Sequence, residues 1–211
     1  MLEFYIRHFD SVEINNSFYR LPSEDALEDW RDSTPPDFLF AVKASRFITH
    51  NKKLNDPQSA LEKFFPRVEI LGRKLGPILF QLPPSWNVNP ERLEAFLRML
   101  PKRRLYVFEM RNHAWHTEAI YETLRVHNAA FCIFDLAGFQ APLEITADFT
   151  YVRLHGPLGP YQGSYPEAAL RIWAERVQKW RRKLKGVYIY FDNDQQAFAA
   201  RNALELKRLL R

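Results

Sequence analysis

YVRLHGPLGPYQGSY, residues 151–165, is the stretch of sequence that decides the fold. Its first five residues alternate between two faces, one of which carries Arg153 and His155, and this two-residue period is typical of a β-strand. Gly156 then begins a loop, and Pro166 opens a helix at a position that tolerates proline. The stretch therefore predicts a strand with polar residues toward its carboxyl end, followed by an aromatic loop and a helix.

The same arrangement recurs along the whole chain. Seven segments have the composition and period of strands, namely 12–15, 38–43, 78–82, 105–111, 129–135, 149–155 and 187–192. Amphipathic segments with helix start signals separate most of them, and Pro66 predicts a kink or a break in the helix that follows Pro57. Strands that alternate with helices predict a mostly parallel sheet.

Each predicted strand has one apolar face and one face that becomes polar near its carboxyl end. The polar residues are Asn15, Lys43, Gln81, Glu109, Arg111, Asp135, Arg153, His155 and Asp192, and Glu13 shares the face of Asn15. An open sheet would scatter them over two helix-covered faces, where unpaired polar groups are costly. A (β/α) barrel of the TIM type would gather them at the mouth where such enzymes place their active sites. We therefore expect a TIM-type barrel with seven strands.

A structural explanation competes with this one at every position. A single polar residue at a strand end is more often a cap or a hydrogen-bonding group, and Glu109 with Arg111 could be an internal ion pair. The loops after the strands also carry large aromatic rings that suit stacking on sugars or bases. These residues are Phe18, Tyr19, Phe47, Trp86, Trp115, Tyr161 and Tyr165. We expect about half of them to have a structural role.

Composition limits the class of protein. The 211 residues are enough for one domain, residues 1–211, and no apolar run reaches the length of a membrane span. The lone Cys132 lies in a strand-like run and predicts a buried thiol in a cytoplasmic protein without disulfides. The net charge of +5 is weak evidence for a nucleic-acid partner, because runs such as 179–185 lie at helix carboxyl ends, which favour cations.

The chain resembles the YecE-like family, a domain of unknown function (number 72). The resemblance is carried, in order, by EINNSFYRLPS (13–23), FAVKASRFITH (40–50), LGPILFQLPPS (75–85), FEMRNHAW (108–115), YVRLHG (151–156) with the tyrosines of its loop, and YFDNDQQAFAARNA (190–203). It implies a TIM-type barrel and supplies no reaction. Members of that family begin with a glycine-rich first strand that this chain lacks, so we expect an N-terminally short domain or an open barrel.

Three functions fit these residues. The first is an enzyme, with hydrolysis as one candidate reaction, that acts on a polar small molecule that is sugar-like or phosphorylated. It would act as a monomer or a dimer. Glu109, Asp135 and His155 would be its acid–base residues. The substrate-binding residues would be Glu13, Asn15, Lys43, Gln81, Arg111, Trp115, Arg153, Tyr161, Tyr165, Asp192 and Asn193.

The second function is a metal-dependent endonuclease, for which the carboxylates and His155 could hold divalent ions. The sequence contains no close-spaced metal motif, so no cofactor is predicted. The third function is a binding protein without chemistry, in which the polar strand ends form a closed network of structural hydrogen bonds.

Overall fold

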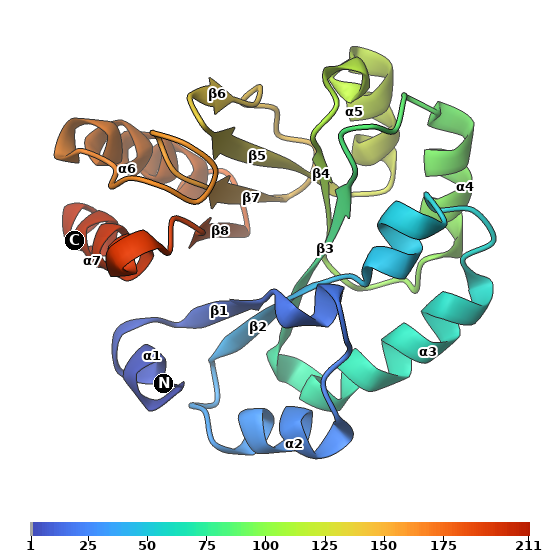
Figure 1. Cartoon of the computed structure of the whole chain (residues 1–211), viewed down its shortest axis with the longest axis horizontal. Helices are drawn as coiled ribbons and strands as arrows, with labels where there is room; N and C mark the ends of the chain where they lie inside the picture. Colours follow the sequence, from blue (N-terminus) through green and yellow to red (C-terminus); the bar gives the residue numbers. More distant parts are fainter. Residues whose placement is uncertain (1) are drawn as a thin grey trace. The chain divides into compact units, whose positions relative to one another are not determined.

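The computed structural model describes residues 2–211, except for the side chains of Leu2 and Phe4. The chain forms two compact units, the first ending at Ala129 and the second beginning at Ala130. Both units alternate strands with helices (Figure 1).

The first unit is built on four parallel strands that pair in chain order. These are β1 (Ser11–Ile14), β2 (Leu39–Lys43), β3 (Leu75–Leu82) and β4 (Tyr106–Met110). Its α-helices are α1 (Leu2–His8), α2 (Glu24–Asp32), α3 (Gln58–Val68), α4 (Pro90–Met99) and α5 (Glu118–Val126). Shorter helical segments follow strands or helices: η1 (Asn16–Phe18), the π-helix η2 (Phe47–Asn51), η3 (Glu69–Lys74) and η4 (His113–Trp115).

The helix boundaries follow local chemistry. The Ser23 hydroxyl accepts a hydrogen bond from the Ala26 amide at the start of α2, and Asn89 caps α4. The break expected at Pro66 does not occur there, because α3 continues to Val68. The chain instead leaves helical geometry at Gly72, whose φ of 58° suits glycine.

The second unit contains three parallel strands, β5 (Ala130–Leu136), β7 (Phe149–Leu154) and β8 (Gly186–Phe191). A short strand that the sequence did not predict, β6 (Phe139–Gln140), pairs antiparallel with β5. Helices α6 (Glu167–Arg181) and α7 (Phe198–Leu209) pack against each other and against β8, and η5 (Gln195–Ala197) precedes α7 (Figure 1).

The parallel pairing and the helical crossovers confirm the predicted fold class, a TIM-type α/β fold with seven parallel strands in the described residues. Cys132 is fully buried in β5, as its sequence context predicted. None of the helices within residues 2–211 combines the length and the apolar character that crossing a membrane requires.

Candidate functional site

The polar strand ends of the first unit share one face of its sheet. Glu13 pairs with Ala41 in the register of β1 and β2, and Lys43 pairs with Leu79 in β3. Gln81 pairs with Glu109 in β4. Because partners across parallel strands point to the same side, and residues two apart along a strand do so too, the predicted alignment of this face is confirmed.

Glu109 is the most deeply buried acid of this face. Its side chain is fully buried, and its Oε1 lies 2.5 Å from Nε of Arg111, whose side chain is 15% exposed. The internal ion pair between Glu109 and Arg111, which the sequence analysis gave as the structural alternative to a catalytic role, is therefore present. Beside it, the Oε1 atom of Gln81 is buried and has no hydrogen-bond partner among the described residues.

Lys43 and His50 both contact the ring of Phe18. His50 was not among the site residues predicted from the sequence. The Lys43 Nζ atom lies 4.3 Å from the centroid of the Phe18 ring, and the His50 ring meets the same ring edge-on at 4.9 Å. Burial lowers the pKa of His50, and the positive charges of Lys43, Arg46 and Arg111 lower it further. The imidazole is therefore neutral near pH 7 and lies among three cations.

The second unit brings three predicted residues together at the carboxyl ends of β7 and β8. Arg153 Nη2 lies 3.1 Å from Asp192 Oδ2, and Nδ1 of His155 lies 3.3 Å from the same oxygen. Arg153 Nη1 lies 3.4 Å from His155 Nε2. All three side chains are less than a tenth exposed, so the Arg153–Asp192 ion pair and the His155 ring lie together out of solvent.

This geometry assigns the tautomer of His155. A guanidinium has only donors, so the Nε2 atom that faces Arg153 accepts a hydrogen bond. The ring proton then lies on Nδ1, which faces the Asp192 carboxylate. A histidine whose second nitrogen faces a buried carboxylate is the usual arrangement of an oriented acid–base group.

Asp135 departs from the prediction. In the register of β5 and β7, Phe134 pairs with Arg153 and Asp135 pairs with Leu154, so Asp135 lies on the opposite face of the sheet from Arg153. Its carboxylate lies close to the Tyr165 hydroxyl, which favours the charged form of the acid. Burial raises the pKa of Asp135, partly offset by that hydroxyl and by positive charge nearby.

The aromatic loop of residues 156–165 is tied down at both ends. The Gly156 amide donates to the Tyr165 hydroxyl at 3.0 Å. The Asn202 Oδ1 atom in α7 accepts from the Tyr165 amide at 3.1 Å and from Asn193 Nδ2 at 2.9 Å. Tyr161, whose φ is 65°, is 47% exposed, and its ring meets the His155 ring edge-on at 5.6 Å. Tyr161 is thus the accessible group beside the buried His155.

Two predicted aromatic contacts are structural. Trp115 is fully buried, and its Nε1 atom donates to the Trp86 carbonyl at 2.9 Å, which is a packing role rather than the predicted contact with substrate. Tyr165 is 4% exposed and ties Asp135 to the loop. In contrast, Asn15 is exposed after β1, where a ligand can reach it.

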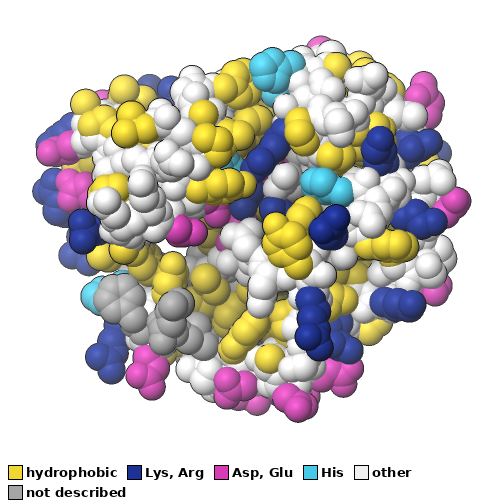
Figure 2. Space-filling view, in the orientation of Figure 1, with side chains coloured by type: hydrophobic (Ala, Val, Ile, Leu, Met, Phe, Trp, Pro, Cys, Tyr) yellow, Lys and Arg dark blue, Asp and Glu magenta, His cyan; other side chains and the backbone are white. Residues whose placement is uncertain are grey.

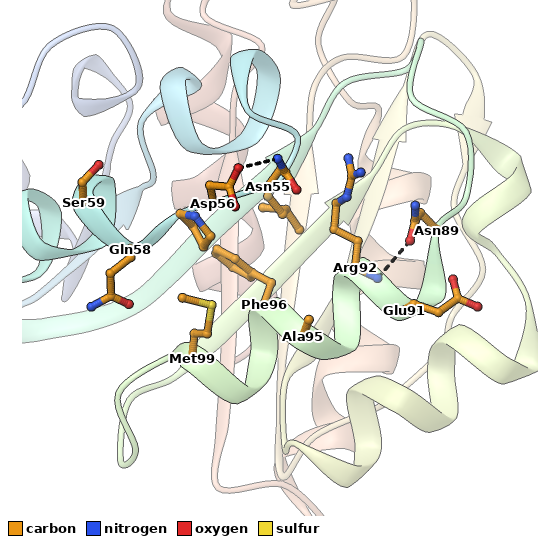
Figure 3. A pocket seen from close by; sticks show the side chains of 12 residues that line it. Asn55, Asp56, Gln58, Ser59, Asn89, Glu91, Arg92, Ala95, Phe96 and Met99 are labelled. Atoms are coloured by element: carbon orange, nitrogen blue, oxygen red, sulfur yellow. Dashed lines mark hydrogen bonds between the residues drawn. The ribbon is translucent and has the colours of Figure 1, made fainter.

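A hollow of about 700 Å³ lies elsewhere in the first unit. Figure 3 shows it between the segment before α3 and the helix α4, with Phe96 and Met99 among its lining side chains and the Asn55–Asp56 hydrogen bond at its edge. None of the residues that line it is a predicted site residue. The hollow is therefore distinct from the chemistry at the strand ends.

Histidines, cysteines and carboxylates do not gather in groups of three or more that could hold a metal ion anywhere in the described part of the chain. Three of the carboxylates that the sequence offered as metal ligands lie against arginine or tyrosine, namely Glu109, Asp192 and Asp135.

The sequence profile of the family "Protein of unknown function DUF72" matches residues 1–211. The chain belongs to the DUF72 family. The UPF0759 protein YunF of Bacillus subtilis is 27% identical over 99% of this chain and 86% of its own length. The UPF0759 protein YecE of Escherichia coli K12 is 34% identical over 114 residues, which are 53% of this chain and 41% of YecE.

A crystal structure of a DUF72 protein from Thermotoga maritima supports the same assignment. It is 31% identical in sequence and superimposes with a TM-score of 0.88 over 99% of this chain and 88% of its own. The family resemblance inferred from the sequence motifs is thus confirmed, together with the fold class of this DUF72 chain.

Proposed function

We propose that this protein is an enzyme that acts on a polar small molecule, sugar-like or phosphorylated, with His155 as its acid–base group. The observation that carries the proposal is the buried contact of His155 with both Asp192 and Arg153 at the carboxyl ends of two parallel strands. In TIM-type barrels the catalytic residues come from these strand ends.

The roles follow from the atoms in contact. Asp192 Oδ2 lies 3.3 Å from Nδ1 of the His155 ring and places negative charge beside it, and Nε2 is the atom that exchanges a proton with a reacting group. Arg153 lies beside that nitrogen and stabilises negative charge as it develops on a substrate oxygen. Tyr161 offers an exposed ring on which a sugar can stack.

Asn193 supports a hydroxylated substrate. Its side chain is fully buried, and its Nδ2 atom donates to the Gly163 carbonyl at 2.8 Å. Its Oδ1 atom has no hydrogen-bond partner among the described residues. A buried acceptor without a donor is costly, and the hydroxyl of a bound molecule would satisfy it.

Thermal-shift measurements across a panel of sugars and sugar phosphates test for binding, and NMR of the hits tests for turnover. His155→Gln and Asp192→Asn should lower turnover of a hit by a factor of about 100 or more, since general acid–base catalysis contributes roughly that much. His127→Gln is the matched control, because His127 follows α5 in the first unit and its Nε2 atom lies 3.0 Å from Glu94 of α4.

Two results contradict the proposal. One is a thermal-shift panel without any response. The other is a hit that His155→Gln, Asp192→Asn and the His127→Gln control all turn over equally fast, which would contradict an acid–base role of His155.

A further inference from the structure

We infer that the first unit carries a binding site for the phosphate group of a small hydroxylated molecule, formed by Lys43, Arg46 and Arg111 around His50. The inference does not rest on the proposed acid–base chemistry, because every residue that carries it lies in the first unit.

The residues of the site come from two places, the carboxyl ends of strands β2 and β4 and the segment that directly follows β2. Lys43 ends β2 and Arg111 follows β4, and both belong to the face that also carries Gln81 and Glu109. Arg46 and His50 come from the segment directly after β2, where Arg46 precedes the π-helix η2. A π-helix is rare and occurs mostly at functional positions.

The charge of the cluster is unbalanced around His50. Three cations act on this ring, Lys43, Arg46 and Arg111, whereas Glu109 is the one carboxylate that acts on it. Glu109 lies against Arg111. Arg46 is exposed, and no carboxylate within residues 2–211 lies at ion-pair distance from it. An oxyanion would pair with the exposed Arg46, and arginine forks match the oxygens of phosphate.

The neutral state of His50 fits such a ligand. A half-buried histidine among cations loses its proton, so the imidazole adds no further repulsion to the cluster. The Thr49 hydroxyl holds its Nδ1 atom at 2.9 Å, which fixes the ring. The Lys43 ammonium and the His50 imidazole both contact the Phe18 ring, which ties the two groups to the same part of the unit.

The neighbouring groups indicate what carries the phosphate. The buried Gln81 Oε1 atom lacks a donor among the described residues and suits a hydroxyl. Tyr19 and Phe47 are 73% and 46% exposed, and they lie beside Phe18 and Lys52 respectively. Figure 2 shows basic and histidine side chains beside exposed hydrophobic ones near the centre of the visible face. A sugar phosphate combines the charge, the hydroxyls and the ring face that these groups recognise.

Isothermal titration in a phosphate-free buffer tests the site, with inorganic phosphate, a hexose phosphate and the free hexose as separate ligands at constant ionic strength. We expect saturable binding of both phosphates and tighter binding of the ester. Arg46→Gln should weaken both by about tenfold or more, the loss expected for one charge-assisted hydrogen bond. Arg46 is exposed, so this variant folds.

Arg98→Gln is the matched control, since it removes one exposed arginine of the same unit that pairs with Glu94 in α4. It should leave both affinities unchanged. Gln81→Leu should weaken the ester and spare inorganic phosphate, which assigns the hydroxyl contact.

The inference is overturned if Arg46→Gln and Arg98→Gln bind phosphate alike, or if chloride at equal ionic strength displaces phosphate fully. It is also overturned if phosphate does not saturate the chain while an oligonucleotide binds with a steep salt dependence, which would indicate a nucleic-acid surface. Unchanged turnover in His155→Gln together with intact phosphate binding would leave this inference standing and contradict only the proposed function of the second unit.

Discussion

The two units hold their polar strand ends in different ways. In the first unit, cations lie against an aromatic ring and around a neutral histidine, as the contacts of Lys43 and His50 with Phe18 show. In the second unit, a buried network of hydrogen bonds ties the loop of residues 156–165 to Asn193 and Asn202. The first arrangement concentrates positive charge around a ring and a histidine, and the second fixes the orientation of the groups that it joins. Charge tolerates small displacements, whereas a hydrogen-bond network does not.

The largest expected effect is in the loop of the second unit. Gly156 has a φ of 116°, and a Cβ atom there would lie 2.3 Å from the Gln162 carbonyl oxygen of the backbone. Gly156→Ala should therefore lower the free energy of unfolding by at least about 3 kcal/mol. Urea denaturation measures it.

Gly138→Ala is the control for this variant. Gly138 has a φ of 82° with nothing within 4 Å of a built Cβ atom, so the change should cost only about 1 kcal/mol of backbone strain. Equal losses for the two variants would show that the close approach to Gln162 does not constrain the loop.

The next effect concerns Asn202, which is 5% exposed and contacts Ser164, Tyr165 and Asn193. Asn202→Ala leaves several buried groups without partners and should cost about 2–3 kcal/mol of unfolding free energy. Asn16→Ala, at an exposed position of the first unit, should change it by less than about 0.5 kcal/mol. A similar small change for Asn202→Ala would mean that the network of the second unit is not rigid.

A smaller effect is expected in the first unit. Phe18→Leu removes the ring that Lys43 and His50 contact and should cost about 1 kcal/mol, which chemical denaturation can resolve. Tyr19→Leu, at a position that is 73% exposed, is the control and should be near neutral. If Phe18→Leu costs as much as Asn202→Ala, the contrast between ring contacts and hydrogen bonds fails.

The smallest effect is a difference in pH dependence. The lowered pKa of His50 means that its contribution to stability is lost as pH falls below 6.5, because the unfolded chain then binds the proton more tightly. The raised pKa of Asp135 has the opposite sign, so stability is lost as pH rises above 3.8 through the folded pKa.

Unfolding curves between pH 4 and pH 8 can separate these contributions. His50→Gln should remove part of the loss on the acidic side of 6.5, and Asp135→Asn should remove part of the loss above 3.8. His8→Gln, at an exposed histidine of α1, controls for the loss of an imidazole. If the free energy of unfolding depends on pH in the same way for the wild type and both test variants, the assigned directions of the two pKa shifts are wrong.

The sequence predicts much of the fold because strand periodicity is local. The alternation in β1 to β4 correctly placed Glu13, Lys43, Gln81 and Glu109 on one face. It failed for Asp135, since alternation says which residues of one strand share a face but leaves open which face of the neighbouring strand they join. That choice depends on the register with β7, which aligns Asp135 with Leu154.

The site residues that sequence reasoning missed are those fixed by distant contacts. Asn202 lies in α7, 37 positions from Tyr165, and nothing in its local pattern indicates that contact. His50 lies in a π-helix, for which the sequence has no periodic signal. The segment FAVKASRFITH carries a lysine, an arginine and a histidine directly after a predicted strand, and this spacing was the signal that could have found the region.

The single thiol of the chain gives the second unit a natural reporter. Cys132 has no exposed surface in the middle of β5, and a reagent reaches a buried sulfur only when the surrounding sheet opens. The rate at which this sulfur is labelled therefore follows the opening of one sheet. The first unit contains no cysteine and therefore gives no labelling signal in the same experiment.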